Sequence, residues 1–192
     1  MSGKQRMTRE RWIATAFELL LLEGPKVIRV DRLCTELTLT KGSFYWHFKD
    51  LAALKSAMVS HWRQVTRSEL ISSATADGQS PRDLVLKLFE AASLRQPGDH
   101  AATMASIAIR HWAGADPAVR RDLADADNER LAFLTTQIRA AGWSGAEARS
   151  RASFLNAALI GLEQLAGEPA QTPTNLSGVI DAMLAPKAGS QA

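Results

Sequence analysis

Cysteine, aromatic residues and long apolar runs are all scarce in this chain of 192 residues. The one cysteine, Cys34, has no partner for an internal disulfide and leaves too few thiolates for a cysteine-based metal site. The longest apolar run has four residues, as in Leu19 to Leu22, far below the roughly 20 that cross a bilayer. No apolar signal segment follows the basic N-terminus. We therefore expect a cytoplasmic protein with no membrane partner.

Groupings of residues that are typical of enzymes are also missing. None of the four histidines (His47, His61, His100 and His111) belongs to a His-x-x-x-His or Glu-x-x-His pair. The sequence has neither a nucleophile elbow nor a Gly-rich phosphate loop. Cys34 lies on the inner side of a short predicted helix, which favours a small core residue over a reactive thiol. The sequence predicts no catalytic residue, no metal site and no cofactor.

The local signals are helical throughout. No segment alternates apolar and polar residues over the length of a strand, whereas apolar residues recur at spacings of three and four. Thr8, Thr40, Asp50 and Ser80 stand at N-cap positions, and Ser144 with Glu147 has the spacing of a capping box. These signals predict an all-α fold of about nine helices, over residues 9–23, 31–37, 41–47, 51–74, 81–94, 100–113, 117–141, 145–166 and 173–185. Residues 187–192 are predicted to be a disordered tail.

Charge is unevenly distributed along the chain. The net charge is +3, but residues 1–67 carry +6 and residues 68–192 carry −3. A basic N-terminal third indicates a head that binds a polyanion. The predicted helix 117–141 carries acidic residues together with Arg120, Arg121 and Arg130. These charges surround the helix without converging, so we interpret them as a solvated face.

Residues 29–50 carry the most informative pattern. A short helix, a tight turn and a second short helix within about twenty residues form the skeleton of a helix-turn-helix. In such a motif the second helix enters the major groove of DNA with its N-terminal end. That end is here Thr40-Lys41-Gly42-Ser43, followed by Tyr45, Trp46 and His47. Phe44 and Phe48 are four residues apart and are predicted to face a small core with Trp12, Phe17 and Leu33.

Residues 8–60 resemble the DNA-binding domain of the TetR family of one-component transcriptional regulators. The resemblance rests on Ala14 and Ala16, on Gly24, on Leu33 and above all on the string TKGSFYWHF at residues 40–48. It implies an all-α homodimer that binds a palindromic double-stranded DNA operator and usually acts as a repressor. It also implies a helix-turn-helix domain over residues 1–49 and a domain for effector binding and dimerisation over residues 50–192.

Carried over position by position, the resemblance implies DNA contacts at Arg29, Thr40, Lys41, Gly42, Ser43, Tyr45, Trp46, His47 and Lys49. Three positions depart from the family pattern. Thr38 replaces the glycine usual in the turn, which implies either a strained turn or a slightly different one. Leu51 replaces a lysine that contacts phosphate. Asp31 repels phosphate unless it caps the short helix or pairs with Arg29 or Arg32.

The remainder of the chain supplies candidate effector and dimer residues. A mostly apolar effector would be surrounded by Phe89, Met104, Ile107, His111, Trp112 and Phe133, on helices that the family uses for its cavity. The last two long helices pair with their mates in the family's dimer. Here that predicts an interface containing Phe154, Leu155, Ala158, Leu159, Gly161, Leu162 and Leu165, with Gly161 allowing a close approach.

Two other functions stay open at this stage. The first is a DNA-binding protein that acts constitutively or through a protein partner, without a small effector. A collapsed interior in the C-terminal domain would favour it. The second is an enzyme that carries a DNA-binding head, which would require converging titratable groups in the body of the chain.

Overall fold

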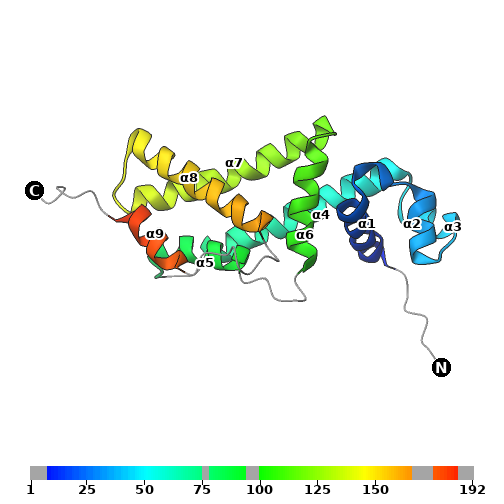
Figure 1. Cartoon of the computed structure of the whole chain (residues 1–192), viewed down its shortest axis with the longest axis horizontal. Coiled ribbons are helices and arrows are strands. Elements are labelled where there is room, and N and C mark those ends of the chain that lie inside the picture. The colour runs from blue at the N-terminus through cyan, green and yellow to red at the C-terminus, as the bar shows by residue number, and fades with distance from the viewer. Residues whose placement is uncertain (1–7, 75–77, 94–99, 166–174, 186–192) are drawn as a thin grey trace, which may run out of the picture. The chain divides into compact units, whose positions relative to one another are not determined.

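The computed structural model describes residues 8–74, 78–93, 100–165 and 175–185 (Figure 1). Within these ranges the chain forms helices and no strand, which confirms the predicted all-α fold. The α-helices are α1 (Arg9–Glu23), α2 (Val30–Leu37), α3 (Lys41–His47), α4 (Leu51–Ala74), α5 (Pro81–Ser93), α6 (His100–Ala113), α7 (Pro117–Ala140), α8 (Gly145–Gln164) and α9 (Leu176–Leu184). A 3-10 turn, η1 (Pro25–Val27), was not predicted. The predicted tail 187–192 lies outside the described residues.

Most helices begin where the capping residues predicted. The side chain of Thr8 accepts a hydrogen bond from the Arg11 amide (3.4 Å), and that of Asp50 accepts one from the Ala53 amide (2.8 Å). Ser144 does stand at the N-cap of α8, but its side chain makes no capping hydrogen bond, so the Ser144 half of the predicted capping box is not formed. The next residue, Gly145, has φ +56°, and its left-handed backbone disturbs the first turn that a capping box needs.

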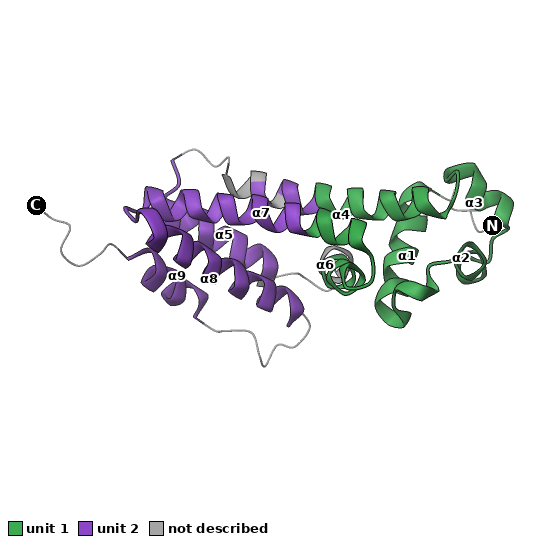
Figure 2. Ribbon diagram, turned by 90° about the horizontal axis from the view of Figure 1, so that it is seen from above, with its two compact units in different colours: residues 1–64, 100–123 green, residues 65–99, 124–192 purple. Residues whose placement is uncertain are grey.

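Contacts divide the chain into two compact units (Figure 2). Unit 1 comprises residues 1–64 and 100–123, and unit 2 comprises residues 65–99 and 124–192. Unit 1 is larger than the predicted helix-turn-helix domain because α6 packs against α1. The predicted functional boundary after residue 49 stays a prediction.

The core of unit 1 is aromatic where the first three helices meet. Trp12 and Phe44 are fully buried, and their rings meet edge to face with centroids 5.4 Å apart. Phe48 is also buried, 5.6 Å from Phe44. Phe17 and Leu33 are buried as well, so the predicted inward direction of this set is confirmed. This core fixes which side of α3 faces outward.

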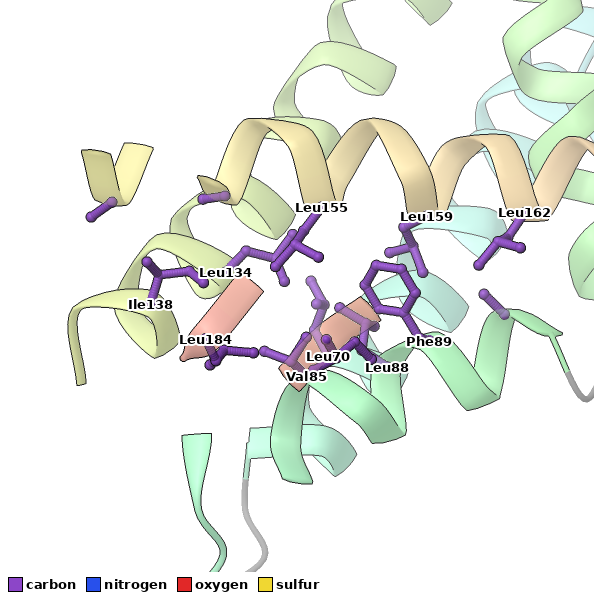
Figure 3. Close-up of a cluster of buried hydrophobic side chains, with 14 of the residues drawn as sticks. Leu70, Val85, Leu88, Phe89, Leu134, Ile138, Leu155, Leu159, Leu162 and Leu184 are labelled. Atoms are coloured by element: carbon purple, nitrogen blue, oxygen red, sulfur yellow. The ribbon is translucent and has the colours of Figure 1, made fainter. Parts of the chain in front are cut away.

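The core of unit 2 joins side chains from five helices (Figure 3). Its labelled members are Leu70, Val85, Leu88, Phe89, Leu134, Ile138, Leu155, Leu159, Leu162 and Leu184. Leu155, Leu159 and Leu162 extend from α8 toward the interior, in the direction of Phe89 on α5. One complete face of α8 is therefore occupied by packing within the chain.

Candidate nucleic-acid interface

The turn between α2 and α3 is closed by a strained threonine. Thr38 has φ 55° and ψ 45°, a left-handed conformation that is an outlier for a β-branched residue. The following amide, of Leu39, donates to the carbonyl of Cys34 at 2.8 Å, so the carbonyls at the end of α2 are satisfied. Of the two alternatives at Thr38, the structure therefore shows a strained turn, and the hydrogen bonds at the end of the helix hold it in place.

The start of α3 is held by Thr40. Its hydroxyl oxygen accepts a hydrogen bond from the Ser43 amide at 3.3 Å, as the sequence predicted. A Cβ at Gly42 would meet only this oxygen, at 3.7 Å, which is an ordinary contact. The fold therefore does not require glycine here, although an exposed glycine weakens a helix by about 0.5–1 kcal/mol relative to alanine. Gly42, which has no side chain, leaves the backbone of α3 uncovered at this position.

The outer face of α3 exposes large side chains. Trp46 is 85% exposed and Tyr45 is 57% exposed, while Lys41 and Gly42 also lie at the surface. Ser43 and His47 are half-buried at the edges of this face, and Lys49 is exposed just beyond the helix. The structure thus brings the predicted DNA-contacting residues of α3 together on one surface. We call Lys41, Gly42, Ser43, Tyr45 and Trp46 the α3 face.

Arg29 and Arg32 of α2 differ in their ion pairs. Arg29, at the N-cap of α2, has its Nε 3.7 Å from the Asp31 carboxylate, and both side chains are more than half exposed. Asp31 therefore pairs with Arg29, because Arg32 is bound at 2.6 Å by both Glu23 and Glu36. An exposed pair of this kind contributes at most about 1 kcal/mol, so Arg29 is readily released to a phosphate.

One further cation was missed in the sequence. Arg9 on α1 lies over the ring of Phe48, with its guanidinium carbon 5.2 Å from the ring centroid. Arg9 and Phe48 are far apart in the sequence, so a local sequence pattern does not show that they meet. At the first position of α4, where the family pattern has a lysine, this chain has Leu51, which is half-buried and neutral.

The candidate effector residues divide between the two units. Phe89 is buried in the core of unit 2, and Phe133 packs against that core. Ile107, His111 and Trp112 belong to unit 1, where Trp112 is buried and His111 is exposed. The side chain of Met104 lies outside the described residues. The six residues are not gathered within one unit, so the apolar effector site stays a prediction.

Two buried charges were missed in the sequence. The side chain of Arg130, interpreted from the sequence as part of a solvated face, is only 2% exposed, and that of Glu163 is 4% exposed. Arg130 Nη2 lies 3.4 Å from Glu163 Oε1. The earlier interpretation was wrong because the partner is 33 positions away, on another helix, and local charge patterning does not detect it.

The predicted dimer surface is reduced by packing within the chain. Leu155, Leu159 and Leu162 are buried in the core of unit 2, so they are not available to a second copy. Phe154 is 56% exposed, and a Cβ at Gly161 would meet nothing within 4 Å. Ala158 and Leu165 are half-buried. The expected interface is thereby revised to the outer side of α8.

Other chemistry gains no support in the described parts of the chain. There, no three histidine, cysteine or acidic residues lie close enough to hold a metal ion. No helix within the same parts is long and apolar enough to span a membrane. Cys34 is buried, and burial raises the pKa of its thiol, in agreement with a core role.

Comparison with known proteins gives a consistent result for the fold. No family model and no curated protein matches the sequence. The structure is similar to a TetR-family transcriptional regulator from Rhodococcus sp., with a TM-score of 0.73, 20% identity and coverage of 92% of this chain and 98% of that one. It is also similar to a TetR-like regulator from Rhodococcus sp. RHA1 (TM-score 0.73, 13% identity, coverage 93% and 94%).

A third similar structure is that of a transcriptional regulator from Saccharomonospora viridis in complex with choline. It has a TM-score of 0.67 and 18% identity, and the alignment covers 92% of each chain. At these identities the likeness concerns the arrangement of helices rather than individual site residues. The chain has the fold of the TetR-family transcriptional regulators.

Proposed function

We propose that the protein is a transcriptional regulator that binds a palindromic double-stranded DNA operator as a homodimer, and that it acts as a repressor. The observation that carries the proposal is the α3 face. Trp46 and Tyr45 are exposed there, while Phe44 and Phe48 on the opposite side are buried in the core. Burying a large apolar side chain stabilises a fold by about 1.5–3 kcal/mol, and Trp46 forgoes that gain. We assign the exposure of Trp46 to contact with a partner.

Each residue of the α3 face has a role in this proposal. Lys41 and Ser43, at the start of the helix, read base edges in the major groove. Tyr45, with Lys49 beyond the helix, binds phosphates and sets the register without reading sequence. Gly42 allows the DNA backbone to approach the helix closely. The net charge of +6 over residues 1–67 supplies the sequence-independent attraction.

The homodimer is proposed on the outer side of α8. Gly161 interrupts the helix with a residue that costs about 1 kcal/mol relative to alanine, yet none of the described residues lies within 4 Å of where its Cβ would be. Phe154, two turns earlier, is exposed. A second copy packed closely over Gly161 accounts for both. Two copies related by a two-fold axis would present their α3 helices to half-sites about 34–36 Å apart.

Release by a small effector completes the proposal. A ligand that favours a different separation of the two α3 helices needs a differential affinity of only a few kcal/mol to release the DNA. The similar regulator from Saccharomonospora viridis has choline bound, which supports ligand binding as a use of this fold.

The proposal is tested by selecting binding sites for the full chain from random double-stranded DNA. We expect an inverted repeat whose half-sites are one helical turn apart. Binding to the selected site should fall at least tenfold in Trp46→Ala and stay unchanged in Arg121→Ala, which removes an exposed cation on α7 of unit 1. Recovery of no sequence preference, or equal binding by both variants, would refute the proposal.

A further inference from the structure

Arg130 and Glu163 form a pair that the stability of unit 2 does not explain. Arg130 lies on α7, and Glu163 lies in the last turn of α8, which ends at Gln164. Both side chains are more than nine-tenths buried, and Arg130 Nη2 lies 3.4 Å from Glu163 Oε1. Apolar residues of similar volume often stabilise such a site as well as an ion pair does.

Two polar atoms of the pair have no partner among the residues that the structure describes. These are Arg130 Nη1, a donor, and Glu163 Oε2, an acceptor. Buried polar atoms are nearly always hydrogen-bonded, so each exception needs its own explanation. The position of Glu163 is also unfavourable in itself, because the C-terminal end of a helix carries partial negative charge.

Apolar side chains surround the pair along both helices. Leu134 follows Arg130 by one turn on α7, and Leu159 precedes Glu163 by one turn on α8. Both leucines are buried in the core cluster of unit 2 (Figure 3). In such surroundings an added net charge is costly, since little water is available to solvate it. A molecule bound here must satisfy both free atoms and bring no net charge.

These requirements exclude ligands that carry a single charge. A carboxylate alone would satisfy Arg130 Nη1, but it would leave Glu163 Oε2 unpaired and add a negative charge. An amine alone would do the reverse. A small zwitterion that carries both a carboxylate and an ammonium group satisfies both atoms and keeps the site neutral.

We propose that Arg130 and Glu163 recognise an amino carboxylate that acts as the effector of this regulator. The role as effector rests on the proposed DNA-binding function, whereas the binding site does not. The ligand is polar where it meets the pair, in contrast to the mostly apolar effector that the sequence predicted.

The test uses the full chain with matched probes: 4-aminobutyrate as zwitterion, butyrate as anion and butylamine as cation. Thermal unfolding is followed at millimolar concentrations of each probe, and operator binding is titrated in parallel. We expect 4-aminobutyrate alone to raise the unfolding temperature and to weaken operator binding at least tenfold. Equal effects of butyrate or butylamine would overturn the proposal, as would no effect of 4-aminobutyrate on the unfolding temperature.

Variants connect the response to the pair. Glu163→Gln removes the charge and should weaken the response to 4-aminobutyrate at least tenfold, whereas Glu129→Gln, at an exposed neighbour on α7, should preserve it. If Glu163→Gln fails to fold, the double replacement Arg130→Leu with Glu163→Leu keeps the core apolar and should also abolish the response. An unchanged response in the double variant would overturn the proposal.

The two proposals fail in different ways. If no operator is found but 4-aminobutyrate still stabilises the wild type and not the Glu163→Gln variant, the binding site stands and the regulatory function fails. If the operator is bound but amino carboxylates stabilise neither protein, the regulator stands and the effector proposal is overturned.

Discussion

Removing one partner of the Arg130–Glu163 pair leaves a charge in an apolar interior with nothing to compensate it. We therefore expect Arg130→Leu and Glu163→Leu each to lower the free energy of unfolding by about 3–5 kcal/mol. For a chain of this length each kcal/mol corresponds to about 2–4 °C, so the unfolding temperature should fall by about 6–20 °C. Both side chains are buried, and Arg130 Nη2 lies 3.4 Å from Glu163 Oε1, so each charge is compensated by the other.

The double variant separates this explanation from ordinary loss of packing. When both charges are replaced together, no unpaired charge is left, and we expect stability within about 1 kcal/mol of the wild type or above it. Urea unfolding followed by circular dichroism measures all four proteins of this cycle. The exposed pair Arg29–Asp31 is the matched control, with an expected coupling below about 1 kcal/mol. The explanation by an uncompensated buried charge is refuted if each single variant lowers the free energy of unfolding by less than about 1 kcal/mol. It is also refuted if the losses of the two single variants add up in the double variant.

Thr38→Gly should raise stability by about 0.5–1 kcal/mol in urea unfolding, because it relieves the left-handed threonine, whereas Thr38→Ala should give no such gain. Lys49→Ala should lower the salt dependence of operator binding by a slope of about 0.9 per lost phosphate contact without changing base preference, and an altered preference would contradict its role. Gly161→Leu should yield monomers in sedimentation and weaken operator binding at least a hundredfold, roughly 3 kcal/mol, while Gly161→Ala stays dimeric. Hydrogen bonds from Arg82 hold the pKa of Asp181 below its ordinary 3.8, so this carboxylate stabilises the fold above that pH and the gain is lost as the pH falls through the lowered pKa; acid unfolding of Asp181→Asn should therefore depend less on pH in that range.

Helix boundaries were predictable because their signals are local. Thr8, Thr40 and Asp50 each accept a hydrogen bond from an amide in the first turn that follows, and this geometry depends on only a few consecutive residues. The end of the chain was less accurate. The predicted last helix begins at residue 173, but α9 is capped by Asn175, whose side chain accepts a hydrogen bond from the Gly178 amide at 2.8 Å.

The α3 face was predictable for a second reason. Phe44 and Phe48 must face a core, and a helix of seven residues then leaves its neighbours Tyr45 and Trp46 outside. The direction of α8 was not predictable in this way. Its apolar surface is broad, and periodicity identifies a buried side without saying whether the chain itself or a second copy covers it. Leu155 and Leu159 proved to be covered by the chain itself.

Buried charges are the part of the molecule that the sequence conceals. Arg130 follows a series of exposed charges on α7, and its residue type alone favours the surface. Only the approach of Glu163, brought by the packing of α8, distinguishes it from its neighbours. The candidate effector residues belong to two different units, and spacing along each helix carries no information on which unit that helix joins.

The base preference of α3 variants tests directly whether this helix reads the DNA sequence. Operator sequences are selected from random DNA in parallel with the wild type, Ser43→Ala and Lys41→Ala. If the start of α3 reads bases in the major groove, each variant should lose preference at one or two positions of each half-site, by about 1–3 kcal/mol per lost pairing, and keep the rest of the consensus. Recovery of the wild-type consensus by both variants would show that the start of α3 does not read bases.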